Sequence, residues 1–334
     1  MRSRRYGIGI CLLLVALIAS GWLGINTGTM NFSAGEIWDA LLGRDFTYAN
    51  IIRDLRVPRT LLAMITGAVL SLGGFYMQAL IKNPLADPYI MGVTAGAGFG
   101  VNLLILGLVP LVSITWFTYP LFAGIGGIAS LMLVAVLGFR SFFEDNAKLL
   151  IAGVAVSSIF TALTGVLIYK FADSDQIRQM VFWSFGSFNK ASWESVYVSG
   201  LMLLAGWIYG ITQARRLDVL VLGDLQAQTL GMRVQRVKLG LLLITSLTVG
   251  GTVAFTGPIG FVGMMIPHFS RSLFGPLHVP NLILGALLGA VYLNGCDLIS
   301  RWILPPAGLP IGVVTAILGV PFFLYLLFSK KSHL

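Results

Sequence analysis

Charge is scarce in this sequence. Only 10% of its 334 residues are Asp, Glu, Lys or Arg, and 57% are hydrophobic, whereas soluble domains have about 25% charged residues. A water-soluble fold could not bury that much apolar surface. The apolar residues also gather in runs near the roughly 17–25 residues that a helix needs to cross a bilayer. Because the alternation typical of a membrane barrel is lacking, the chain is expected to be an all-α polytopic membrane protein.

Other absences exclude several functions. The two cysteines, Cys11 and Cys296, lie inside apolar runs, so neither a disulfide framework nor a metal site is indicated. No Gly-x-x-x-x-Gly-Lys-Ser/Thr motif occurs, and any use of ATP must therefore come from a partner. The net charge is +9, but the basic residues are scattered over short loops, which disfavours nucleic acid. No cluster of His, Asp and Glu indicates a membrane-embedded enzyme.

Ten apolar runs have about the length of a membrane crossing. They lie at residues 6–25, 60–81, 89–109, 117–138, 149–169, 196–212, 239–255, 259–274, 281–299 and 311–328. With the N-terminus inside, 14 of the 22 Lys and Arg residues fall on the inner side. The positive-inside rule then predicts that both termini are cytoplasmic. The first run also suits a signal peptide, but it lacks a clear cleavage site, and a retained helix is favoured.

The whole chain, residues 1–334, is expected to form one transmembrane domain with three longer connections between the crossings. Two are external, at about 26–59 and 170–195, and the first holds an amphipathic stretch, Ala34–Leu42, preceded by a Ser33 cap. The third, at about 213–238, is cytoplasmic, and its periodicity indicates two short helices separated near Gly231. A structured cytoplasmic loop is a candidate contact for a partner.

The glycines of "GVTAGAGFG", residues 92–100, do not follow a strand, as a phosphate-binding turn would require. Packing between helices through small residues is the better interpretation.

Asp297 is the main charged residue inside an apolar run. Such a carboxylate can serve as a proton or sodium site in a secondary transporter. Arg301 lies four residues later on the same helical face, so the two can also form a structural pair. The structural interpretation is favoured, and the proton-coupled carrier stays open as an alternative.

Three long motifs together resemble the FecCD-type permeases, the membrane subunits of ABC importers for ferric siderophores, haem, cobalamin and, in some members, molybdate. They are "RVPRTLLAMITGAVLSLGGFYMQALIKNPLADPYIMGVTAGAGFG", "GPIGFVGMMIPHFSR" and "LPIGVVTAILGVPFFLYLL". The resemblance runs from about Ile51 to the C-terminus. It implies a type II ABC importer permease fold with ten helices, working as a homodimer or a closely similar pair in a bacterial inner membrane. It also implies two cytoplasmic ATPase subunits, which hold ATP and Mg²⁺, and an external substrate-binding protein; this chain would carry no cofactor and no metal.

The resemblance assigns roles at the two ends of the pore. Asn83 and Leu85 match the cytoplasmic gate, where Pro84 and Pro88 would end the helix and free a short stiff loop; a plain connecting turn is the alternative. On the outside, three arginines match positions that receive carboxylates of the binding protein: Arg56, Arg59 and Arg301. From the residues alone, Arg56 and Arg59 are ordinary interfacial anchors. Gly308 departs from the family, which often has Glu there.

The long cytoplasmic loop resembles the element that couples the permease to its ATPase. Gly223, Asp224, Leu230 and Gly231 match that pattern, and a rigid-body push from the ATPase would pass through them. The stretch "DLQAQ" departs from the family's more acidic and alanine-rich run.

The fifth run resembles the helix that lines the pore. Four residues there form a face of small side chains: Gly153, Val156, Ser157 and Thr161. Such a face suits a wide path that binds its cargo weakly, or it serves close helix packing. The expected function is ATP-driven import of a bulky iron chelate by alternating access, with ferric siderophore favoured and haem, cobalamin and molybdate left open.

Overall fold

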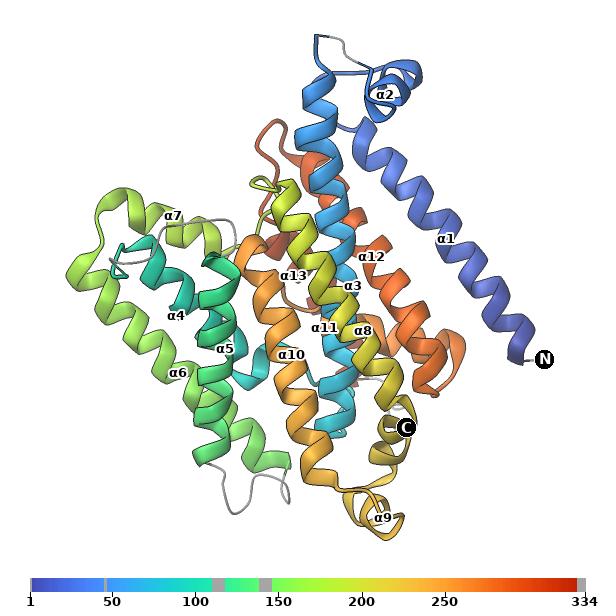
Figure 1. The fold of residues 1–334 in the computed structure, drawn as a ribbon, viewed down its shortest axis with the longest axis vertical. Coiled ribbons are helices and arrows are strands. Elements are labelled where there is room, and N and C mark those ends of the chain that lie inside the picture. The colour runs from blue at the N-terminus through green and yellow to red at the C-terminus, as the bar shows by residue number, and fades with distance from the viewer. Residues whose placement is uncertain (1, 45–46, 110–117, 138–145, 329–334) are drawn as a thin grey trace.

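The computed structural model describes residues 2–44, 47–109, 118–137 and 146–328, and the secondary structure of these residues is entirely helical (Figure 1). The longer helices are α1 (Arg2–Asn26), α3 (Val57–Ile81), α4 (Val93–Ile105), α5 (Thr118–Leu137), α6 (Asn146–Phe171), α8 (Trp193–Leu222), α10 (Val234–Thr256), α11 (Val262–Phe274), α12 (His278–Ile303) and α13 (Ile311–Phe328). The shorter elements are α2 (Ala34–Leu41), α7 (Ser174–Ser184), α9 (Asp224–Thr229), a π-helical turn η1 (Ile51–Arg56) and a 3₁₀ turn η2 (Pro88–Met91).

The all-helical membrane fold expected from the sequence is confirmed. Each of the ten apolar runs overlaps one of the longer helices, and six helical segments among the described residues are long and apolar enough to cross a bilayer. The helices α4 and α11 have 13 residues each, or about 20 Å at 1.5 Å per residue, which is less than the roughly 30 Å hydrocarbon core. Ten crossings and cytoplasmic termini therefore stay predictions. Arg140, Lys330 and Lys331, which entered the charge count, lie outside the described residues.

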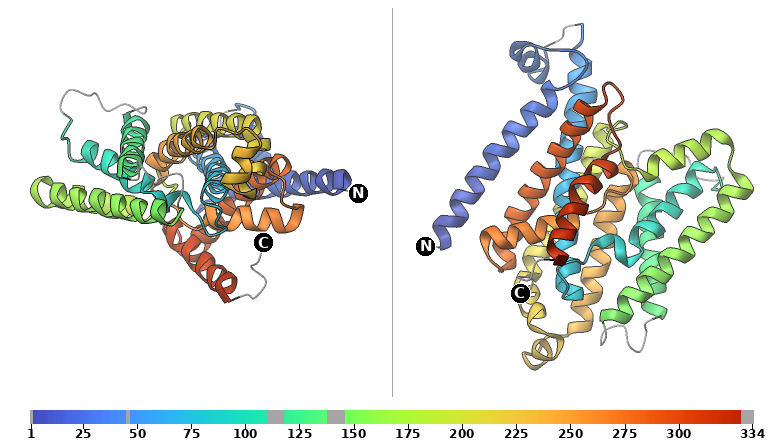
Figure 2. Two further views of the ribbon diagram at one scale, coloured as in Figure 1. Left: turned by 90° about the horizontal axis from the view of Figure 1, so that it is seen from below. Right: turned by 180° about the vertical axis from the view of Figure 1, so that it is seen from behind.

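The helix α3 forms the centre of the molecule. Nearly all of its residues are buried, and it packs against α8, α10, α11 and α12. The helices α4 to α7 form a group on one side, beside α10, and α1 lies on the opposite side along α12 (Figures 1 and 2). Figure 1 places α2 and α7 toward one end and α9 at the other; we call these the α2 end and the α9 end.

Small residues allow the central helices to approach closely. A Cβ atom added to Gly67 of α3 would collide with the backbone carbonyl of Gly289 on α12. Gly96 of α4 and Gly126 of α5 face each other in the same way. The interpretation of the glycine run 92–100 as a helix-packing surface is therefore confirmed, since Gly96 belongs to that run.

The connections have local structure of their own. Ser33 caps α2 as expected, and its hydroxyl accepts a hydrogen bond from the backbone N–H of Glu36 at 3.2 Å. The connection expected at 213–238 holds one short helix, α9, and the expectation of two short helices there is wrong, because residues up to Leu222 continue α8 and α10 begins at Val234. The 30 residues of α8 span about 45 Å, and the exposed Arg215 and Arg216 can keep their charged groups in water beyond the lipid.

Candidate functional site

Arg56 is a buried arginine at the α2 end that hydrogen-bonds the connection after α1. It ends η1, and its guanidinium donates to the carbonyls of Ile25 and Asn26, both at 2.9 Å, and of Met30 at 2.5 Å. The guanidinium carbon also lies 4.7 Å from the centre of the Phe32 ring. Only 7% of Arg56 is exposed, so this arginine fastens the connection after α1 to the start of α3.

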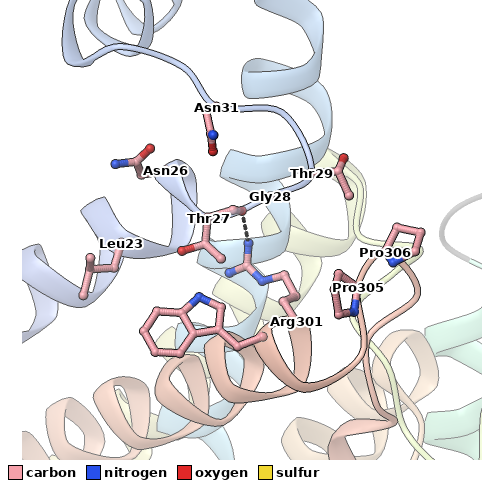
Figure 3. Close-up of a pocket in the computed structure, with 10 residues that line it drawn as sticks. Leu23, Asn26, Thr27, Gly28, Thr29, Asn31, Arg301, Pro305 and Pro306 are labelled. Carbon is pink, nitrogen blue, oxygen red and sulfur yellow. Dashed lines mark hydrogen bonds between the residues drawn. The ribbon is translucent and has the colours of Figure 1, made fainter.

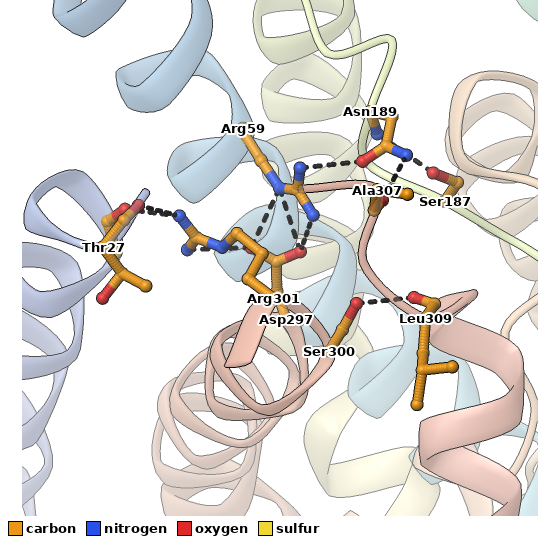
Figure 4. A network of polar contacts seen from close by, with 10 residues as sticks. Thr27, Arg59, Ser187, Asn189, Asp297, Ser300, Arg301, Ala307 and Leu309 are labelled. Atoms are coloured by element: carbon orange, nitrogen blue, oxygen red, sulfur yellow. Dashed lines mark hydrogen bonds and ion pairs between the residues drawn. The ribbon is translucent and has the colours of Figure 1, made fainter. Parts of the chain in front are cut away.

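Arg59 and Arg301 bind the same carboxylate (Figure 4). Arg59 of α3 donates to both oxygens of Asp297 at 2.7 to 3.1 Å, and Nη2 of Arg301 lies 3.0 Å from Oδ2. Asp297 is fully buried on α12, whereas the side chains of Arg59 and Arg301 are 17% and 9% exposed. Arg59 also donates to Asn189 at 2.7 Å. The structural pairing of Asp297 with Arg301 is present, and Arg59 is a second partner.

Arg301 lies beside a cavity of about 450 Å³ between the end of α1 and the connection after α12 (Figure 3). Its Nη1 donates to the carbonyls of Gly24 at 2.8 Å and Thr27 at 2.7 Å. The indole of Trp302 and the rings of Pro305 and Pro306 line the same cavity. Arg301 thus ties α1 to α12 at the α2 end.

These contacts bear on two expectations. The guanidinium of Arg56 donates to carbonyls of this chain, Nη1 of Arg301 donates to two more, and Arg59 is the most exposed of the three arginines. Docking of a binding protein at these residues stays a prediction. The carboxylate of Asp297 accepts hydrogen bonds from Arg59, forms an ion pair with Arg301 and is shielded from solvent, which favours a structural role over that of a transported-ion site.

The expected gate residues lie in a compact turn after α3. The side-chain oxygen of Asn83 accepts from the N–H of Leu85 at 2.9 Å, and its backbone carbonyl accepts from Ala86 at 3.0 Å. Asp87 then caps η2 by accepting from the N–H of Tyr89 at 3.0 Å. Burial raises the pKa of the Asp87 carboxyl to about 6. The segment is held by its own hydrogen bonds; whether it closes a pore stays a prediction.

The expected coupling residues lie at the α9 end, where α8 turns into α9. Gly223, with φ of 134°, makes the turn in a conformation suited to glycine, and Gly231, with φ of 80°, makes the next one. Leu222, Leu225 and Leu230 are 66%, 73% and 68% exposed. An apolar surface on a protruding turn is typical of a protein-binding site.

Asp224, the first residue of α9, lies between two lysines. Its Oδ1 is 2.8 Å from Nζ of Lys82, which follows α3, and its Oδ2 accepts from Nζ of Lys238 on α10 at 2.7 Å. Burial alone would raise the pKa of Asp224, but the hydrogen bonds and charges of Lys238 and Lys82 hold it below its ordinary value. Lys82, which directly precedes Asn83, therefore links the start of the gate segment to the coupling turn.

The four expected pore residues divide between two environments on α6. Gly153 and Val156 are buried, whereas Ser157 and Thr161 line a concavity of about 500 Å³. Tyr89, next to the gate segment, lines the same concavity. Ser157 donates to the carbonyl of Gly153 and Thr161 to that of Ser157, both at 2.8 Å. The small face thus serves packing on one side and borders open space on the other.

Sequence reasoning missed three partners at these sites. In the sequence, Lys82 and Lys238 belong to the 14 basic residues of the inner side, and nothing distinguishes Asn189. The charge of Lys238 near the end of a predicted crossing was the one available signal, since a lysine there needs a counter-charge when it is buried.

The described residues form a helical membrane fold with a protruding turn at the α9 end, and the comparisons with known proteins define its family. The model of the FecCD transport family matches residues 12–329, and the chain belongs to that family.

Curated relatives include the hemin transport system permease protein HmuU of Yersinia pestis, 36% identical, with coverage of 98% of this chain and 97% of the relative. The vitamin B12 import system permease protein BtuC of Klebsiella pneumoniae is 35% identical, with coverage of 99% and 96%. A solved inward-facing conformation of a metal-chelate type ABC transporter is 29% identical, with a TM-score of 0.84 and coverage of 96% of this chain and 98% of that one.

Proposed function

We propose that the chain is the membrane-spanning permease subunit of an ATP-driven importer. It moves a bulky metal chelate from an external binding protein to the cytoplasm by alternating access. The proposal rests on membership of the FecCD transport family and on the relatives named for hemin and vitamin B12 transport. Ferric siderophore is the favoured cargo, with haem, cobalamin and molybdate as the alternatives.

The exposed leucines at the α9 end are the single structural observation that carries the proposal. Three leucines are exposed at this end: Leu222, Leu225 and Leu230. They lie where α8, at about 45 Å, extends beyond the roughly 30 Å of hydrocarbon core. Three leucines left in water would be unfavourable by roughly 1.5–3 kcal/mol each. A cytoplasmic ATPase subunit that covers them removes this cost, and its closure on ATP would move α9 against the membrane helices.

The proposed assembly follows the family. Two copies of this chain, or this chain and a paralogue, associate with two cytoplasmic ATP-binding subunits in the inner membrane of a bacterium. A substrate-binding protein docks at the α2 end, where Arg59 is the most exposed of the three arginines. ATP and Mg²⁺ bind to the ATPase subunits, and we propose that this chain holds neither a cofactor nor a metal.

The test is ATP hydrolysis by the assembled complex in lipid discs, with and without the binding protein. Leu230→Asp places a charge in the proposed ATPase contact, and it is expected to release the ATPase on purification and to abolish stimulation by the binding protein. Leu42→Asp, a change of the same kind at a 56% exposed leucine of the α2 end, is the matched control for ATPase retention. Equal retention of the ATPase by Leu230→Asp and Leu42→Asp would contradict the proposed contact.

A further inference from the structure

Lys82 occupies an unusual backbone conformation at the point where α3 ends. Its φ of 55° and ψ of 38° are left-handed, a region that costs an ordinary L-residue roughly 1–2 kcal/mol and usually holds glycine. This conformation turns the chain out of α3 directly into Asn83. The position of Lys82 therefore decides where the gate segment begins.

The side chain of Lys82 reaches a different part of the protein. Its ammonium lies 2.8 Å from Oδ1 of Asp224, the residue that opens α9. Since α9 packs on α8 and α10, this ion pair joins the coupling turn to the gate segment across elements that are far apart in the sequence.

The second partner of Asp224 makes the arrangement asymmetric. Lys238 is 1% exposed, whereas the side chains of Lys82 and Asp224 are each 22% exposed. A buried charge that loses its partner is strongly disfavoured, while a partly exposed pair can exchange with water at small cost. The Lys238 pair thus fixes Asp224 on α10, and the Lys82 pair is the partly exposed link from Asp224 to the end of α3.

We infer that the ion pair between Lys82 and Asp224 transmits the movement of α9 to the gate segment at Asn83, and that Lys82 is a positioning residue for the transport step. The inference rests on the proposed function, because it needs an ATPase that moves α9. When α9 shifts, Asp224 pulls the ammonium of Lys82, and the strained turn beside Asn83 shifts with it. Without this pair the complex would still hydrolyse ATP, but a smaller fraction of the hydrolysis events would open the gate.

The test measures chelate transported per ATP hydrolysed in liposomes that hold the full complex. Lys82→Met keeps the length and the apolar stem of the side chain but removes the charge. We expect it to assemble and to hydrolyse ATP with binding-protein stimulation, while transport per ATP falls about fivefold, the low end of typical coupling energies. Lys82→Arg is expected to restore the ratio, because the charge returns. If Lys82→Met fails to assemble, Lys82→Gln replaces it with the same expected fall.

Lys148→Met is the matched control, since Lys148 is an exposed lysine near the start of α6, at the same end of the molecule, and we expect it to leave transport per ATP unchanged. An unchanged ratio in Lys82→Met would overturn the inference, and so would an equal loss in Lys82→Met and Lys82→Arg. Failure of the proposed function would appear differently, as transport by the unaltered complex that needs no ATP.

Discussion

At the residue scale, Asp297 is the group on which two interpretations differ. As the shared partner of two arginines, it is a structural residue, and in the alternative it is the site of a coupled proton. Asp297→Asn leaves the largely buried Arg59 and Arg301 without a counter-charge, which typically costs about 3–5 kcal/mol. We therefore expect a lower unfolding temperature in detergent and unchanged ATP-driven uptake per folded molecule.

The matched control is Asp39→Asn, which removes the exposed ion pair between Asp39 and Arg44 and is expected to change stability by less than about 1 kcal/mol. An Asp297→Asn protein as stable as the unaltered one, with its uptake abolished, would favour the proton-coupled carrier.

Asp87 gives a prediction about pH. Burial raises its pKa from 3.8 to about 6, so the folded protein favours the neutral carboxyl, and stability declines as pH rises from about 4 through 6. The shift corresponds to about 3 kcal/mol. Asp87→Asn keeps an oxygen that can cap η2 and removes the ionisation. The unfolding temperature of this variant relative to the unaltered protein is expected to rise between pH 4 and pH 7.5, and a difference independent of pH would contradict the assignment.

At the element scale, the crossing of α3 and α12 depends on glycine. A Cβ on Gly67 would collide with the backbone of Gly289, whereas a Cβ on Gly295 of α12 meets nothing within 4 Å. Gly67→Ala is expected to lower the free energy of unfolding by about 1–3 kcal/mol through overpacking. Gly295→Ala should be neutral or stabilising by up to about 1 kcal/mol, because alanine favours helix. Thermal unfolding of both variants in one detergent measures this, and equal effects would refute the close-packing account.

The helices themselves could be predicted from sequence because length and hydropathy decide membrane segments. The cap at Ser33 could also be predicted, because its partner Glu36 is only three residues away. The pairing of Asp297 with Arg301 was also local. The pairing with Arg59 was not, because 238 positions separate the two residues and only the packing of α3 on α12 brings them together. The contact of Lys82 with Asp224 could not be predicted either, because only the packing of the helices brings these distant residues together.

At the scale of the whole molecule, an ion pair links each end of the central helix α3 to another part of the protein. Arg59 connects α3 to Asp297 at the α2 end, and Lys82 connects the end of α3 to Asp224 at the α9 end. The nearly fully buried α3 lies between them as a stiff element. This arrangement suits rigid-body movement driven from the α9 end.

The central claim is that ATP, and not an ion gradient, drives the transport. The most direct measurement is uptake into vesicles by the chain co-expressed with its ATPase and binding protein, using radiolabelled iron as a siderophore chelate and as haem, with labelled cobalamin alongside. The account predicts uptake that requires both ATP and the binding protein and that survives an uncoupler. Uptake that requires neither and collapses with the uncoupler would contradict it.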